Sequence, residues 1–341
     1  MNWYREILEK LTEAPCLVLE RQFRGEAGSC SDMKTELKER ADASETGMEA
    51  LLQGCPACRR KQEAWEVAEP FFPKERLIIL GGGHVALPVA EFGARVGFSV
   101  TVVDDRLSFA NPGRFPMAEQ VICDEFSHAV EALKIQESDY ICILTRGHRH
   151  DAECLRMIGQ GKEPAYLGMI GSRRRVAIVK QELLDDGYDP ERMSHLRSPI
   201  GLKIGGVTPE EIAISIMAEI IQVKRLDRED KRVKNRSDLD FEVLKRLAEE
   251  TDEPKAVVTV IASQGSSPRG AGAKMIVYRD GRILGSIGGG CSEAAVLGEA
   301  RRLIGSGGYR VVHVDLSGEA AEDEGMVCGG VMDVLIEDYG V

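Results

Sequence analysis

The sequence predicts an α/β protein that combines a doubly wound parallel sheet with a smaller, mixed α/β domain. The first observation is a short apolar run at residues 77–80 that ends in three glycines and leads into a helical pattern. In a doubly wound fold, the first buried parallel strand is followed by a glycine-rich turn and then by a helix. The second is a set of three glycine-rich loops between residues 264 and 330, separated by short β-branched runs and one helical pattern. Short strands and a single helix of this kind predict the smaller domain.

The composition is that of a globular protein and argues against several classes of function. The 341 residues suffice for two or three domains with substantial cores, and 43% of them are hydrophobic. A net charge of −12 argues against a nucleic-acid partner, because phosphate binding needs clustered Lys and Arg. No apolar run approaches the roughly twenty residues that span a bilayer, and Glu6, Glu9 and Lys10 interrupt any signal-peptide core. We therefore expect a cytoplasmic protein without a membrane span.

Residues 1–73 are expected to form a small α/β region. An amphipathic pattern at residues 4–13 leads into the apolar run 16–19, and a similar pattern at 241–250 precedes the apolar run 256–260. We interpret this as a weak internal repeat, a degenerate copy whose glycine loops are missing. The alternative is a chance similarity between two short amphipathic helices.

The nine cysteines show no disulfide framework, and their odd number is consistent with reduced thiols. Cys55 and Cys58 form a C-x-x-C pair, which can supply half of a metal site, iron–sulfur ligands or a redox couple. A second pair at comparable spacing is missing, so a closed site would need Cys30 and one further ligand. A packing or solvent-facing role is the alternative.

The predicted parallel sheet occupies residues 74–227 and opens with a nucleotide-binding fingerprint. Gly81 and Gly83 fit the pattern G-x-G-x-x-G/A, in which small residues allow a tight turn and the approach of a pyrophosphate. A second strand ends at Asp104, where a carboxylate bonds a ribose 2′-hydroxyl and repels a 2′-phosphate. The spacing predicts a Rossmann-like domain that, if it binds a nucleotide, prefers NAD. His84 either touches a phosphate or faces solvent.

Polar side chains follow two further predicted strands, at residues 140–144 and 165–170. Because the carboxyl ends of parallel strands face the ligand crevice, these side chains are candidates for ligand binding. His148 is a candidate general acid or base, or a group that positions a ligand, and an exposed loop histidine is the alternative. The candidates are Thr145, His148, Ser172 and Arg173.

A densely charged stretch of mixed sign, residues 228–240, is predicted to be an exposed linker. It leads to the smaller domain, at residues 241–341. Cys291 follows three glycines and precedes a helical pattern, a position where the helix dipole favours a thiolate. Backbone amides, an arginine and serine hydroxyls suit a phosphorylated, oxygen-rich ligand. The candidate residues of these loops are Ser266, Ser267, Arg269, Gly288, Gly289, Gly290, Cys291 and Cys328.

In their order and spacing, these glycine and cysteine segments closely resemble the cysteine-bearing module of the XdhC/CoxI family. Its members are accessory factors of molybdenum hydroxylases such as xanthine dehydrogenase and aerobic carbon monoxide dehydrogenase. The preceding domain resembles the other module of that family. The motifs that carry this second resemblance are I-L-G-G-G-H-V-A at 79–86, V-D-D-R at 103–106, L-T-R-G-H at 144–148 and L-G-M-I-G-S-R at 167–173. The family usually places the cysteine-bearing module first, whereas here it comes second.

The resemblance implies a carrier role. It implies a protein that binds the molybdenum cofactor (molybdopterin), supports its sulfuration with a cysteine desulfurase as partner, and inserts it into an apo-hydroxylase. Cys291 and Cys328 match the cysteine motifs of the family. They either ligate molybdenum or relay sulfur, and the sequence leaves both roles open.

Two other functions stay open as well. One is an NAD(P)-dependent oxidoreductase that uses Gly81, Gly83 and Asp104, although no acid–base dyad stands out. The other is a scaffold protein without a cofactor. The apolar run Leu17-Val18-Leu19 would form an exposed edge in an incomplete N-terminal module. Such an edge must be covered by another domain or subunit, and we expect a homodimer.

Overall fold

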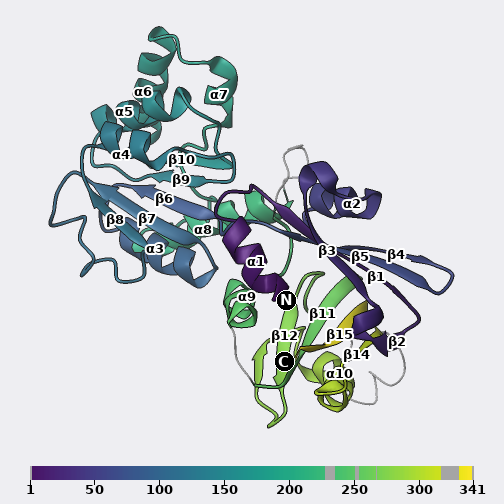
Figure 1. Ribbon diagram of the computed structural model, residues 1–341. Coiled ribbons are helices and arrows are strands. Elements are labelled where there is room, and N and C mark those ends of the chain that lie inside the picture. Colours follow the sequence, from purple (N-terminus) through teal and green to yellow (C-terminus); the bar gives the residue numbers. More distant parts are fainter. Residues whose placement is uncertain (1, 227–234, 250–252, 266, 316–329, 340–341) are drawn as a thin grey trace. The chain divides into compact units, whose positions relative to one another are not determined.

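The computed structural model describes the chain except residues 1, 227–234, 250–252, 266, 316–329 and 340–341. The chain forms two compact units (Figure 1). One joins Met1–Pro73 to Lys231–Val341, and the other is Lys74–Asp230. The two ends of the chain therefore build one unit together. No helix in the described ranges is both long and apolar enough to cross a membrane.

The unit Lys74–Asp230 is built on a five-stranded parallel sheet with the order β10-β9-β6-β7-β8. Its strands are β6 (Arg76–Leu80), β7 (Ser99–Asp104), β8 (Gln120–Cys123), β9 (Tyr140–Ile143) and β10 (Tyr166–Met169). Its helices are α3 (Ala86–Arg95), α4 (Phe126–Leu133), α5 (His148–Gly159), α6 (Arg173–Asp185), α7 (Pro190–His195) and α8 (Pro209–Leu226). The strand order reverses between β6 and β9, which is where ligands bind in open α/β sheets. The predicted Rossmann-like fold is confirmed.

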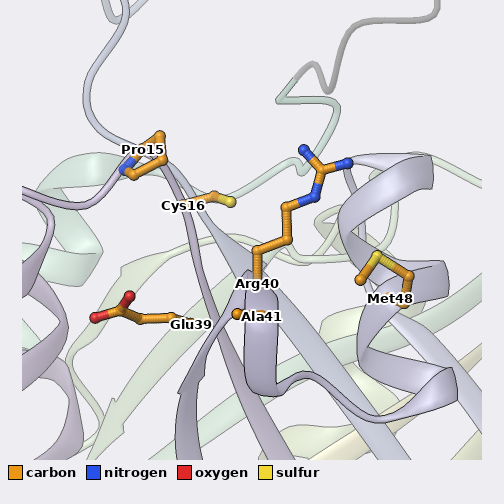
Figure 2. Close-up of a pocket in the computed structure, with 6 residues that line it drawn as sticks. All are labelled: Pro15, Cys16, Glu39, Arg40, Ala41 and Met48. Carbon is orange, nitrogen blue, oxygen red and sulfur yellow. The ribbon is translucent and has the colours of Figure 1, made fainter.

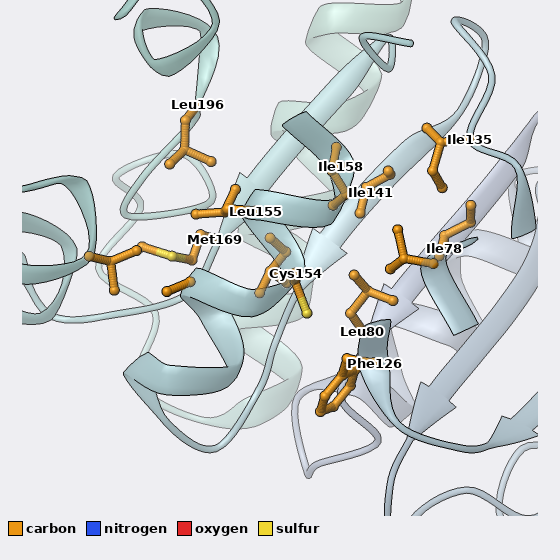
Figure 3. Packing of buried hydrophobic residues seen from close by; sticks show 14 of the residues in the cluster. Ile78, Leu80, Phe126, Ile135, Ile141, Cys154, Leu155, Ile158, Met169 and Leu196 are labelled. Carbon is orange, nitrogen blue, oxygen red and sulfur yellow. The ribbon is translucent and has the colours of Figure 1, made fainter. Parts of the chain in front are cut away.

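The apolar residues of β6 alternate between the two faces of this sheet. Ile78 and Leu80 lie on one face with Phe126 of α4 and with residues of α5, as Figure 3 shows, and residues of α6 belong to the same cluster. Leu77 and Ile79 pack with α3 and α8 on the other face. All four side chains are fully buried. A strand that is covered on both faces needs a continuous apolar run, which explains the run that the sequence displays.

The N-terminal part of the other unit forms an antiparallel sheet with the order β3-β1-β5-β4. It consists of α1 (Trp3–Lys10), β1 (Leu17–Arg24), β2 (Ala27–Ser29), β3 (Lys34–Glu39), α2 (Glu45–Gln53), β4 (Ala57–Lys61) and β5 (Ala64–Phe71). Strand β1 has a neighbour on each side, and Leu17, Val18 and Leu19 are fully buried. The exposed apolar edge that motivated the homodimer is therefore absent, because the chain itself covers these residues.

The C-terminal part forms a sheet with the order β13-β12-β11-β15-β14-β2, in which β2 comes from the N-terminal part. Its elements are α9 (Phe241–Ala248), β11 (Lys255–Gln264), β12 (Lys274–Tyr278), β13 (Ile283–Gly285), α10 (Gly290–Leu303), β14 (Gly308–Asp315) and β15 (Val331–Tyr339). The predicted mixed α/β domain is confirmed.

The two parts share one topology. The order helix, two main strands, helix, two strands is the same in both, and the strand order β3-β1-β5-β4 corresponds to β12-β11-β15-β14. The registers correspond as well, since Glu69 lies opposite Leu19 in one sheet and Glu337 lies opposite Val257 in the other.

The two sheets pack face to face. Leu19 and Phe71 share a buried cluster with Val257 and Ile276, and a second cluster likewise mixes residues of both sheets. Helix α2 packs on the outer face of the first sheet, and α10 packs on the outer face of the second. The result is a four-layer arrangement of helix, sheet, sheet and helix within one unit.

A buried ion network crosses this interface. Arg21 of β1 is bonded to Glu69 and, at 3.0 Å, to Glu337. Lys274 of β12 lies 2.6 Å from Glu69 and donates a hydrogen bond to Thr259 at 2.8 Å. Burial alone would raise the pKa of Glu69, but Lys274 and Arg21 hold it below its usual value. Burial lowers the pKa of Lys274.

Candidate functional site

The glycine loop before α10 has a backbone that only glycine adopts readily. Gly288, Gly289 and Gly290 have φ angles of 133°, 68° and 50°, which are unfavourable for residues that carry a Cβ. A Cβ on Gly288 would lie 2.8 Å from Cβ of Pro268. The predicted glycine loop and the serine-proline-arginine loop are therefore in contact.

Glu293 holds this glycine loop by its carboxylate. Oε1 accepts hydrogen bonds from the Ser286 hydroxyl at 2.6 Å, from the Gly289 amide at 3.0 Å and from the Ile287 amide at 3.3 Å. The Ser292 hydroxyl donates to the Gly289 carbonyl at 2.8 Å. Sequence reasoning missed Glu293. A glutamate in the first turn of a helix that reaches back to preceding amides is the signal that could have found it.

The second loop is held by Asp238. Arg269 donates from Nε to Oδ2 of Asp238 at 2.7 Å and from Nη2 to its carbonyl at 2.8 Å, and the Gly270 amide donates to Oδ2 at 3.0 Å. The Ser267 hydroxyl donates to the Arg269 carbonyl at 2.7 Å. Arg269 and Ser267, both predicted to bind a ligand, thus also stabilise their own loop. Asp238 belongs to the predicted linker, of which residues 228–234 lie outside the described residues.

The thiol groups of Cys291 and Cys328 lie outside the part of the chain that the structure describes. Cys291 is the second residue of α10, but its side chain is not among those described, and Ser266 and Cys328 lie outside the described residues. The structure therefore gives the backbone around Cys291 and the loops on either side of it.

In the parallel-sheet unit, Asp104 is already saturated with donors. Oδ2 accepts from the Gly82 amide at 2.8 Å and from Arg106 Nη2 at 3.0 Å. Oδ1 accepts from the amide of Arg106 at 3.1 Å and from its Nε at 2.8 Å. A carboxylate offers about four acceptor positions, and Asp104 is 1% exposed. In this conformation it has no acceptor left for a ribose hydroxyl.

The segment after β7 lies on the fingerprint loop. Arg114 donates to the carbonyls of Gly82 and Gly83 at 3.3 and 3.4 Å, and the guanidinium of Arg106 stacks 3.7 Å from the ring centroid of Phe109. A Cβ on Gly82 would collide with the Phe109 carbonyl. Protein atoms therefore cover this loop on the side of Asp104.

The carboxyl ends of β9 and β10 carry a second hydrogen-bond cluster. The Thr145 hydroxyl donates to Asp151 at 2.6 Å, and Arg175 donates to Asp151 at 2.6 Å and to the Thr145 carbonyl at 3.1 Å. Burial raises the pKa of Asp151, against the opposing effect of Thr145 and Arg175. Ser172 is the N-cap of α6, while His84, His148 and Arg173 are exposed. Thr145 is thus bonded within its own cluster, and the two histidines lie at the surface, which leaves both of their predicted roles untested.

Cys55 and Cys58 are half-buried, and burial raises the pKa of both thiols. Cys58 packs against the cluster that contains Phe23 and Trp65. Within the described ranges, no three His, Cys, Asp or Glu side chains gather into a group that could hold a metal ion. Cys55 and Cys58 therefore belong to no such group among the residues that the structure describes.

A cavity of about 500 Å³ lies in the N-terminal part, and Figure 2 shows its lining. Burial raises the pKa of the Cys16 thiol, which disfavours its reactive thiolate form. None of the predicted site residues contributes to the cavity. Its lining residues are Pro15, Cys16, Glu39, Arg40, Ala41 and Met48.

Both candidate sites fall within segments that match family models. Residues 77–220 match a model described as the XdhC Rossmann domain, and residues 248–315 match one described as the XdhC and CoxI family. The fingerprint loop lies in the first segment and the glycine loop with Cys291 in the second. The Rossmann module therefore precedes the cysteine-bearing module along the chain.

Three curated relatives share parts of the chain. The chain is 38% identical over 153 residues to the uncharacterized protein YqeB of Escherichia coli K12, and the match covers 44% of this chain and 28% of YqeB. It is 35% identical over 153 residues to a protein of Bacillus subtilis 168 named as a probable xanthine dehydrogenase component, covering 45% of this chain and 44% of the relative. It is 39% identical over 74 residues to the molybdenum cofactor insertion chaperone PaoD of Escherichia coli K12, and this match covers 22% of this chain and 23% of PaoD. The chain spans less than half the length of each relative.

Among solved structures, the chain is similar to a xanthine dehydrogenase from Bacillus halodurans. The sequences are 26% identical, and the match covers 64% of this chain and 62% of the other, with a TM-score of 0.48.

Proposed function

Since the chain belongs to the XdhC/CoxI family, we propose that it is an accessory protein of a molybdenum hydroxylase, which binds the molybdenum cofactor and delivers it to the apo-enzyme. The observation that carries the proposal is the glycine loop at the start of α10, which lies in the segment that matches the family. The name of the relative PaoD supports the chaperone role.

The chemistry of this loop suits the molybdenum cofactor. Molybdopterin carries a phosphate, and the N-terminus of a helix of 14 residues favours a negative charge. Among the described residues, apart from its two chain neighbours and the backbone of α10, no atom lies within 4 Å of a Cβ placed on Gly289. The backbone there is open to a ligand, and a helix-terminal position favours the thiolate of a cysteine such as Cys291.

The proposal includes a role for sulfur. Soft thiolates suit a molybdenum centre, so Cys291 and Cys328 either bind the metal or pass on sulfur received from a cysteine desulfurase. The enzyme that is served would be of the xanthine dehydrogenase or the carbon monoxide dehydrogenase type.

The parallel-sheet unit would have a supporting role in nucleotide binding, with NAD or another adenine nucleotide as ligand. The oxidoreductase alternative has less support, because the carboxylate that would bind the ribose is bonded to Gly82 and Arg106.

The decisive experiment measures molybdopterin in the purified protein. The protein is expressed in a host that makes the cofactor, and the bound pterin is oxidised to its fluorescent form. We expect fluorescence near one equivalent per chain, and activation of an apo-hydroxylase on mixing. A protein that neither retains the pterin nor activates the enzyme, although both are supplied in excess, contradicts the proposal.

A further inference from the structure

The carboxylate of Glu293 lies beside the proposed cofactor loop without belonging to it. One of its oxygens accepts hydrogen bonds from Ser286, Ile287 and Gly289. We propose that Glu293 is a positioning residue for cofactor binding, which fixes the glycine loop in the conformation that binds the cofactor. This inference rests on the proposed function.

The loop needs such a partner because of its composition. Three successive glycines with positive φ have more freedom in the unbound state than any other residues would have. A loop that must be ordered on binding weakens affinity, whereas a loop that is ordered beforehand does not. Glu293 removes this freedom from the side of α10, and contact with Pro268 restricts Gly288 from the other side.

The geometry favours a positioning role over a role in proton transfer. Oε1 already receives three donors, two of them backbone amides, so the carboxylate is engaged with the loop. Its position in the first turn of α10 is favourable for a negative charge. The Gly288 amide donates to the Ser286 hydroxyl oxygen at 3.1 Å, which links the loop residues to the same hydroxyl that Glu293 holds.

Three variants of the full chain test this assignment. Glu293→Ala removes the acceptor. Glu293→Gln keeps an acceptor oxygen at the same place and removes the charge. Glu299→Ala is the matched control, because Glu299 lies on the same helix and its carboxylate bonds only the side chains of Arg302 and Arg310, at 2.6 and 2.7 Å, among the described residues.

Two measurements are made on each variant: hydrogen exchange of the Ile287 and Gly289 amides, and the molybdopterin retained after purification. We expect Glu293→Ala to exchange these amides about tenfold faster, as loss of about 1.4 kcal/mol of local protection implies, and to retain at least tenfold less pterin. Glu293→Gln and Glu299→Ala should remain within about twofold of the wild type. Rescue by glutamine separates the hydrogen bonds from the charge.

Any other result contradicts either the positioning role of Glu293 or the proposed function. If the wild type retains pterin and Glu293→Ala retains as much, the positioning role is wrong. Equal losses in the alanine and glutamine variants also overturn it, because the charge would then be what matters. If the wild type retains no pterin, the proposed function fails, and the amide exchange alone decides whether Glu293 orders the loop.

Discussion

Arg106 and Arg269 are each bound by a carboxylate of the same chain, Asp104 and Asp238. Both pairs lie beside a glycine loop, and in both the carboxylate also accepts a hydrogen bond from a glycine amide of that loop, Gly82 or Gly270. Single side chains therefore set the shape and the charge of both candidate sites.

The thiol of Cys291 gives the first prediction at this scale. Cys291→Ser should lose molybdopterin retention or sulfur delivery by at least tenfold without lowering the melting temperature, because serine keeps the volume and the backbone of a helix start. Pterin fluorescence and activation of an apo-hydroxylase are the measurements. Cys123→Ser, an exposed thiol of β8, is the control. Unchanged activation together with unchanged retention in Cys291→Ser would contradict the prediction.

The pair Asp104–Arg106 gives the second prediction at the scale of single residues. Arg106→Ala removes two of the four donors to Asp104 and so frees acceptor positions for ribose hydroxyls. We expect NAD to bind about tenfold more tightly than to the wild type, a gain of about 1.4 kcal/mol, as titration calorimetry would measure. NADP is the control ligand and should remain the weaker one, since its 2′-phosphate meets the freed carboxylate. Equal affinities of wild type and variant for NAD would refute this.

At the scale of elements, the two ends of the chain build the same arrangement twice. The order of helices and strands, the order of strands in the sheet and the positions of Glu69 and Glu337 all correspond. We propose that residues 1–73 are a second copy of the module at 241–341. The N-terminal sequence lacks the triple-glycine loop of the C-terminal one, so the copy would serve as a packing partner and not as a binding module.

The start of α10 gives the prediction for an element. Gly288→Ala should lower the free energy of unfolding by about 1–3 kcal/mol, because its φ of 133° is unfavourable with a Cβ and Pro268 is close. Gly298→Ala on the same helix is the matched control. Outside the backbone of the helix, Arg302 is the one described residue within 4 Å of a Cβ placed there, at 3.6 Å, so alanine should stabilise the helix by about 0.5–1 kcal/mol. Urea denaturation of both variants checks this, and equal effects of the two would contradict it.

At the scale of the whole molecule, the chain ends are joined by charge as well as by apolar contact. Arg21 and Glu69 come from the first 73 residues, whereas Lys274 and Glu337 come from the last hundred or so, and they form one network. Removing one member leaves the others buried without a partner, which costs more than the network contributes when it is complete.

Glu69→Gln tests this network. We expect the variant to lose about 3 kcal/mol of the free energy of unfolding, because Lys274 then keeps a buried charge without its carboxylate. Urea denaturation at neutral pH measures the loss. Glu36→Gln is the control and should unfold nearly as the wild type does, because the Glu36 side chain on β3 is 41% exposed and its pairs with Lys34 and Lys38 are screened by solvent. A Glu69 variant as stable as this control would show that the network is dispensable.

The lowered pKa of Glu69 also predicts that the stability of the fold depends on pH. The pKa of Glu69 lies below its usual value of 4.5 in the folded protein, so its ionised form stabilises the fold above that value. The contribution decreases as the pH falls from there through the folded-state pKa. The difference in urea midpoint between wild type and Glu69→Gln should therefore shrink below about pH 4.5. A difference that grows in acid would have the wrong sign.

The sequence by itself determined the parallel sheet, the glycine turns and the family. These features are local: an apolar run such as 77–80, a glycine triplet and the spacing to Asp104 each lie within a few tens of residues. Strand periodicity and turn chemistry are properties of such short segments, so the sequence suffices to predict them.

Only the tertiary structure decided what the polar groups of the sites do and how the chain ends pair. Asp238 and Arg269 are 31 residues apart in the sequence, and Arg21 and Glu337 are 316 apart. Periodicity carries no information on such partners, because a side chain that could meet a ligand can equally meet another side chain. The burial of Leu17–Leu19 has the same origin. Leu17 and Leu19 are covered by α1 and by residues from the far end of the chain, which meet them only when the two sheets pack. Val18 points to the other face of the sheet and packs with residues of α2.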